Sequence, residues 1–184
     1  MVTEPLTILG AVIHRPLRAP VATAPAGTPE PLQLAVEVEN PSDVPLHVWA
    51  SRRAYDFDAS THVLTIYLTE HIPPLPPGIE LISNHPRTPV LVVVNPKSRI
   101  KIKVQVPAVF RRRVAGTAQG KGFVEEPIKQ IERVDLHIQH ATEPIKSRVG
   151  ESPAKFRERL RGHGSIARAN VALGAESPQQ EGEE

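Results

Sequence analysis

The sequence predicts an all-β fold: an immunoglobulin-like antiparallel β-sandwich of about seven to eight strands, followed by a short C-terminal helical extension and a disordered acidic tail. Apolar residues alternate with polar ones at period two in many short segments, which is typical of strands with one buried face. Proline contributes 20 of 184 residues, about twice its usual share. Because these prolines separate β-branched runs, we interpret them as breaks between short strands.

The clearest strand pattern lies between Pro89 and Pro107. Residues 90–94 are an unbroken apolar run, and residues 95–98, Asn-Pro-Lys-Ser, are typical of a turn. From residue 99 to 106, cationic or polar side chains alternate with Ile and Val. This stretch predicts a β-hairpin with one face in the core and a cationic face in water.

The other strands follow from the same alternation. We expect a first strand at residues 6–15, kinked at Gly10, and a proline-rich connector up to residue 31. Residues 32–38 and 44–50, separated by the turn at 40–43, predict a second hairpin. Further strands are expected at residues 63–69, 79–82 and 131–140.

The pattern changes beyond Thr142. Ser152 and Pro153 are suited to the N-cap and first position of a helix, in which Phe156 and Leu160 form an apolar pair four residues apart. A second, weaker helix is expected at residues 166–173, between Ser165 as its cap and Gly174 as its stop.

These elements divide the chain into three regions. Residues 1–144 are expected to form the sandwich, with a flexible excursion at 108–129. Residues 145–174 are expected to form a basic helical extension. Residues 175–184 have a composition that buries too little apolar surface to become ordered, so we expect a disordered tail.

Charge is distributed unevenly along the chain. The formal net charge is only +2, yet residues 81–124 contain nine Lys and Arg side chains and no acidic one. Such a segment attracts phosphates or an acidic protein surface. The candidate binding residues are Arg99, Lys101, Lys103, Arg111, Arg112, Arg113 and Lys121. The alternative interpretation is that these cations are solvated, protect a sheet edge, or pair with the acidic residues between positions 30 and 58.

The expected first helix is a second candidate for contact with a partner. Its apolar stripe of Phe156 and Leu160 is surrounded by cations, among them Arg157 and Arg161. A helix this short is unstable alone in water. We therefore expect it to dock on the sandwich or on a partner.

No catalytic signature is present. The cluster of Gly116, Gly120, Lys121 and Gly122 lacks the spacing, the Ser or Thr and the following helix of a phosphate-binding loop. The chain has no cysteine, which excludes thiol catalysis, disulfides and thiolate zinc sites. The Gly-x-Ser-x-Gly pattern of serine hydrolases is also missing.

Metal and acid–base chemistry have weak candidates. His137 and His140 lie three apart in an expected strand and so face opposite sides, and none of the eight histidines follows a helical metal motif. Asp56 and Asp58 would share a face and could bind a cation or act as paired carboxylates. Solvated turns or pairing with Arg52 or Arg53 explain them more simply.

The segment Tyr55, Asp56, Phe57, which the chain reaches after an expected strand, resembles the intracellular proteinase inhibitor family of immunoglobulin-like domains. The resemblance covers three residues, and no activity or site residue is transferred from it.

Together these observations predict a non-enzymatic, cytoplasmic binding or assembly module that engages a protein partner, without cofactor or metal. The absence of cysteine and of any apolar run long enough to span a bilayer underlies the expected location. Nucleic-acid or anionic-membrane binding through the same cations is the first alternative, and aromatic residues for base stacking are scarce. A hydrolase or metal-dependent enzyme built on Asp56 and Asp58 is the second. The oligomeric state does not follow from the sequence.

Overall fold

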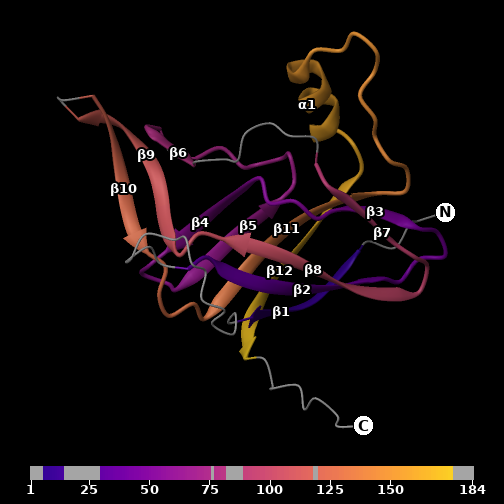
Figure 1. Ribbon diagram of the computed structural model, residues 1–184, viewed down its shortest axis with the longest axis horizontal. Helices are drawn as coiled ribbons and strands as arrows, with labels where there is room; N and C mark the ends of the chain where they lie inside the picture. Colours follow the sequence, from indigo (N-terminus) through magenta and orange to yellow (C-terminus); the bar gives the residue numbers. More distant parts are fainter. Residues whose placement is uncertain (1–5, 15–29, 76, 82–88, 118–119, 176–184) are drawn as a thin grey trace, which may run out of the picture.

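The computed structural model describes residues 6–14, 30–75, 77–81, 89–117 and 120–175. In these residues the chain forms twelve strands and one helix (Figure 1). They are β1 (Thr7–His14), β2 (Leu32–Asn40), β3 (Leu46–Trp49), β4 (Ala54–Asp58), β5 (Val63–Leu68), β6 (Ile79–Leu81), β7 (Leu91–Val94), β8 (Ser98–Val106), β9 (Val109–Thr117), β10 (Gly120–Pro127), β11 (Arg133–Ala141), α1 (Pro153–Arg161) and β12 (Ser165–Ala175). The predicted β-rich fold is confirmed.

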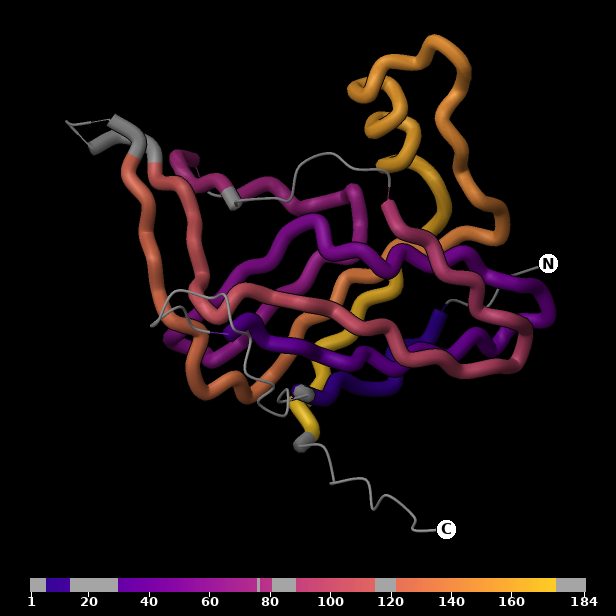
Figure 2. Tube along the Cα trace, in the orientation of Figure 1, coloured from indigo at the N-terminus to yellow at the C-terminus, as the bar shows by residue number. Residues whose placement is uncertain are grey.

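The strands form two sheets. The large one has nine strands, in the order β4-β5-β11-β12-β1-β2-β8, with β3 pairing with β11 and β7 pairing with β3. It curls around one apolar core (Figures 1 and 2). The small sheet has the order β10-β9-β6. The expectation of purely antiparallel pairing is wrong, because β5 with β11 and β1 with β12 are parallel.

The predicted alternation identifies the buried faces correctly. Val134, Leu136 and Ile138 of β11 are fully buried, and the inward residues of β2 and β8 join the same core. The kink expected at Gly10 is also present, as a shift in the register between β1 and β2 from Ile8 to Gly10. All eight expected strands exist, and β4, β9, β10 and β12 are additional.

Both predicted hairpins are wrong in their pairing. β7 and β8 flank the turn at residues 95–98 but do not pair with each other, and neither do β2 and β3. Instead, β2 pairs with β8 and β3 pairs with β7. The two short connections therefore lie next to each other and carry the chain from one part of the curled sheet to another.

Asn40 joins these two connections. Its side chain is fully buried, and its Nδ2 donates to the carbonyl oxygens of Val44 at 2.8 Å and Val94 at 2.9 Å. Its Oδ1 accepts from the Ser42 backbone N–H at 3.0 Å and from the Ser42 hydroxyl at 2.7 Å. Because one amide satisfies polar groups of both connections, it favours their stacking over two independent hairpins.

The second predicted helix is also wrong, since residues 165–175 form β12. Ala167, Ala169, Val171 and Leu173 alternate with Arg168, Asn170 and Ala172. β12 pairs with β11 along Arg133–His140 and with β1 at its end. Pairing with an otherwise open strand outweighs the helix propensity of the alanines. The sheet therefore continues past residue 144, where it was expected to end.

The predicted excursion at 108–129 is likewise mostly strand, because it contains β9 and β10. Residues 176–184 of the predicted tail lie outside the described residues.

The first predicted helix is confirmed as α1. Ser152 caps it by accepting from the Lys155 N–H at 3.4 Å, and Phe156 and Leu160 are buried. The buried amide of Gln139 on β11 fixes the end of this helix: its Nε2 donates to the carbonyl oxygens of Leu160 at 2.5 Å and His163 at 2.7 Å. Its Oε1 accepts from the Thr69 hydroxyl at 2.8 Å, which ties the helix to the end of β5.

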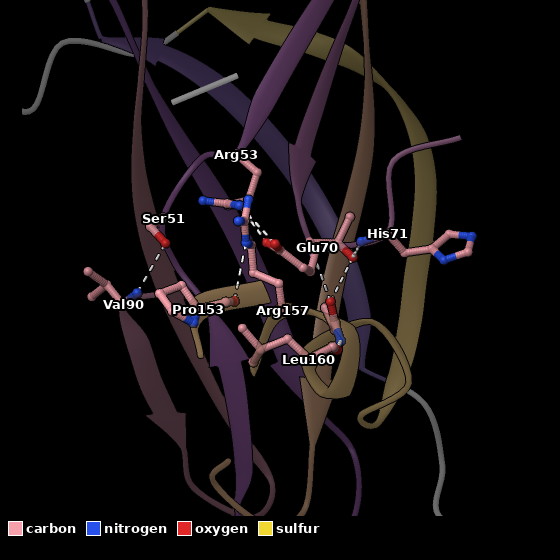
Figure 3. A network of polar contacts seen from close by, with 10 residues as sticks. Ser51, Arg53, Glu70, His71, Val90, Pro153, Arg157 and Leu160 are labelled. Carbon is pink, nitrogen blue, oxygen red and sulfur yellow. Dashed lines mark hydrogen bonds and ion pairs between the residues drawn. The ribbon is translucent and has the colours of Figure 1, made fainter. Parts of the chain in front are cut away.

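A buried ion pair lies beside this network (Figure 3). The Nε of Arg53 is 2.6 Å from Oε2 of Glu70, and its Nη2 donates to Oε1 at 2.8 Å. The Glu70 backbone N–H donates to Gln139 at 3.0 Å. One set of buried polar groups thus joins three segments: the residues after β5, the residue before β4, and the end of α1.

Candidate interaction surface

The predicted cations of β8 lie on its outer face, opposite acidic residues of β2. The Arg99 Nε is 3.2 Å from the Glu39 carboxylate. Lys101 stands opposite Glu37 and Lys103 opposite Ala35 in the register of the two strands. Of these three cations, Arg99 therefore pairs with an acid from a distant part of the sequence, Lys101 stands opposite one, and Lys103 does not.

The three consecutive arginines lie on β9, in the small sheet. Arg111 is 2.9 Å from the Glu125 carboxylate on β10, and Arg113 is 3.5 Å from that of Glu80 on β6. Arg112 points to the other face, where its guanidinium lies 5.3 Å from the Phe110 ring centre. The side chain of Lys121 lies outside the described residues.

Arg111 and Arg113 also flank one aromatic ring. Their guanidinium carbons are 4.4 Å and 5.8 Å from the ring centre of Phe123, which sits opposite Arg113 on β10. The Phe123 side chain is 49% exposed, and Val124, on the other face, is 40% exposed. Two cations thus hold an exposed aromatic ring on one face of the β9–β10 hairpin.

The base of this hairpin is fixed to the core. Phe110 is fully buried and meets the Tyr55 ring edge-on, with ring centres 5.9 Å apart. The Tyr55 hydroxyl donates to the Val109 carbonyl oxygen at 3.0 Å, and burial is the main cause that raises its pKa. From this anchored base the hairpin extends away from the large sheet (Figure 1).

The candidate residues of α1 have a different environment. Phe156 and Leu160 pack into the protein's own core cluster. Arg157 donates to the Pro153 carbonyl oxygen at 3.3 Å, and Arg161 is exposed. The apolar stripe of α1 is therefore covered by the sheet on which it docks.

Asp56 and Asp58 share the outer face of β4 but have separate partners. Asp58 accepts from the Ser60 hydroxyl at 2.6 Å, and hydrogen bonds from Ser60 and Thr61 lower its pKa to about 2. This exposed turn keeps the carboxylate ionised. The Oδ1 of Asp56 accepts from the Phe57 N–H at 2.9 Å. The two carboxylates therefore accept hydrogen bonds from different groups.

A polar row that the sequence did not reveal crosses the outer face of the large sheet. Strand pairing aligns Asp56 with Thr65, and Thr65 with Asp135. Asp135 lies 3.3 Å from the His137 ring, which packs against Tyr67 with ring centres 5.0 Å apart. Burial is the main cause that raises the pKa of Tyr67, and the negative charges of Asp56 and Asp135 raise it further. Only the pairing of β4, β5 and β11, which alternation cannot specify, brings these residues together.

His140 has no place in this row, because it lies on the opposite face and is 5% exposed. Burial lowers its pKa. Within the described residues, no group of three or more His, Asp or Glu side chains is arranged to hold a metal ion. The same part of the chain contains no helix that is long and apolar enough to cross a membrane.

Comparison of the chain with protein-family models, with curated proteins and with solved structures found no match.

Proposed function

We propose that this chain is a non-enzymatic protein-binding module whose β9–β10 hairpin contacts the partner. The observation that carries the proposal is the half-exposed Phe123 ring between Arg111 and Arg113. Aromatic and arginine side chains are enriched at the energetic centres of protein interfaces. The flanking guanidinium groups restrict the ring before binding, which reduces the entropy lost when a partner covers it.

The charges around the ring favour a protein partner over nucleic acid. Glu125 and Glu80 already neutralise Arg111 and Arg113 in part. In the part of the chain that the structure describes, Lys101, Lys103 and Arg112 form no ion pair. Phosphate binding would depend on these three side chains. Nucleic acid or an anionic membrane therefore stays the alternative partner, and it requires an affinity that falls steeply with salt.

Two further parts of the proposal concern fold family and location. We propose that the curled sheet is a variant of the immunoglobulin-like sandwich. Its support is that inward residues of β2 and β8 share one core with those of β5 and β11. A cytoplasmic location is supported by the complete absence of cysteine.

Reversing the three arginine charges tests whether the hairpin binds. The variant Arg111→Glu, Arg112→Glu, Arg113→Glu and the wild-type protein are immobilised and exposed to native lysate at low and high salt. We expect the wild type to retain proteins at both salt concentrations and the variant to lose them, because the cation–π contacts with Phe123 are gone. A melting curve controls for folding, since Arg112 also covers the buried Phe110.

The possible outcomes separate the alternatives. Material that the wild type retains only at low salt, and that nuclease treatment removes, would favour nucleic acid. A folded triple variant that retains everything the wild type retains would show that the hairpin cations take no part in binding.

A further inference from the structure

Among the described strands, β10 has one edge that no strand covers. It pairs with β9, and no other described strand pairs with it. The Ile128 N–H donates to the Ala108 carbonyl oxygen at 2.8 Å, and the register of β9 with β10 continues from this bond. Because hydrogen-bonded pairs alternate in an antiparallel ladder, Val124 and Glu126 direct their backbone groups towards β9. Phe123 and Glu125 therefore direct their N–H and C=O groups outwards, away from the hairpin.

This edge differs from the other long edge, that of β8. Proteins commonly protect edges with cations and with contacts that cover the backbone. β8 carries Arg99, Lys101 and Lys103, and Arg52 donates to its Gln105 carbonyl oxygen at 2.8 Å. β10 instead exposes Phe123 and Val124 along its open edge. Pro127 ends it, because proline has no N–H to offer a neighbouring strand.

We propose that β10 pairs with β10 of a second copy of this chain, antiparallel, around a two-fold axis that passes beside Val124. In this register Phe123 of each copy lies opposite Glu125 of the other copy. The outward N–H and C=O groups of these two residues can then bond to each other. The two residue pairs then form four backbone hydrogen bonds. The partner is a second copy because this short edge is complementary to itself.

The side chains on both faces agree with this register. On one face, Val124 meets Val124 of the second copy, so two exposed apolar side chains cover each other. On the other face, one row of side chains crosses the four strands. It consists of Arg113 and Phe123 of one copy, followed by Glu125 and Arg111 of the second copy. The Glu125 carboxylate of one copy thus lies beside the Phe123 ring of the other, which two arginines flank. No two like charges lie directly opposite each other.

This inference rests on the proposed function, because it names the partner of the same hairpin. The interface is one strand pair wide, which places it among small and reversible contacts. Self-association is therefore expected to increase with protein concentration.

Cysteine cross-linking tests the register directly, since the chain has no cysteine of its own. In Val124→Cys, the two thiols would lie on facing residues of a non-hydrogen-bonded pair, within the Cα separation that a disulfide requires. Val149→Cys, on a fully exposed residue before α1, controls for random collision. Under mild oxidation at equal concentration, we expect Val124→Cys to form covalent dimer about tenfold faster or more, as a preformed pair raises the local thiol concentration.

A second variant tests whether the dimer depends on backbone hydrogen bonds of β10. Glu125→Pro removes an outward N–H and leaves the bonds to β9 in place, whereas Glu125→Ala changes only the side chain. In sedimentation at high concentration, the proline variant should lose the dimer that the wild type and the alanine variant form. Equal cross-linking of the two cysteine variants, or a dimer that survives Glu125→Pro, would overturn the inference. The proposed function would still stand if hairpin variants lose a different captured protein, so the two failures are distinguishable.

Discussion

Replacing Glu70 with alanine is expected to lower the free energy of unfolding by about 3–5 kcal/mol, the usual cost of removing one partner of a buried ion pair. The Arg53 and Glu70 side chains are only 10% and 5% exposed, and two short contacts join them. Without the carboxylate, the guanidinium loses the charge that compensates for its removal from water. The measurement is equilibrium unfolding in urea with unchanged denaturant dependence.

An exposed ion pair provides the control. The pair between Arg113 and Glu80, which Glu80→Ala breaks, has side chains that are 41% and 69% exposed. Water and salt already screen such a pair, so the expected loss is below about 1 kcal/mol. Equal losses for the two variants would mean that the Arg53–Glu70 pair contributes no more than a surface contact.

Replacing Gly164 with alanine is expected to cost about 2–5 kcal/mol, from left-handed backbone strain together with overpacking. Gly164 has a φ of +75°, and a Cβ there would lie 2.1 Å from the His140 carbonyl oxygen. A backbone atom cannot move aside as a flexible side chain does. The turn from α1 into β12 would have to shift, and with it the pairing of Ser165 with His140.

Two other glycines separate the contributions to this cost. Gly150 has a φ of +76° but no atom within 4 Å of an added Cβ, so Gly150→Ala should show the backbone strain alone, about 1 kcal/mol. Gly10 likewise has free space and no positive φ, and its alanine variant should be nearly neutral. If thermal melting places Gly164→Ala level with Gly150→Ala, the close approach to β11 is not rigid.

The sequence was sufficient to predict eight of the twelve strands in the described residues and their buried faces, but not which strands pair with each other. Alternation shows that Val134, Leu136 and Ile138 point into a core, because side-chain direction is a local property of the backbone. It cannot show whether β7 continues into a hairpin or crosses to another part of the sheet. The buried amide of Asn40, which reaches the distant Val94 carbonyl oxygen, favours the crossing.

The candidate site follows the same rule. The sequence identified Arg111 and Arg113 as cations in an acid-free segment, yet their carboxylate partners, Glu125 and Glu80, lie just outside that segment and meet them through strand pairing. No pattern in the sequence distinguishes Phe123 as a binding residue. Its position opposite Arg113 depends on the β9–β10 register, which the sequence alone does not specify.

The proposal that the hairpin binds a protein through Phe123 has a direct test. Wild type, Phe123→Ser and the control Val90→Ser, which changes a 59% exposed residue next to β7, are immobilised at equal density, and the proteins they capture from native lysate are quantified. We expect the wild type and Val90→Ser to capture the same proteins in equal amounts. Phe123→Ser should capture at most about one tenth of that amount, as expected when a central interface residue is removed. Capture that is equal for all three, or absent for the wild type, would contradict the proposal.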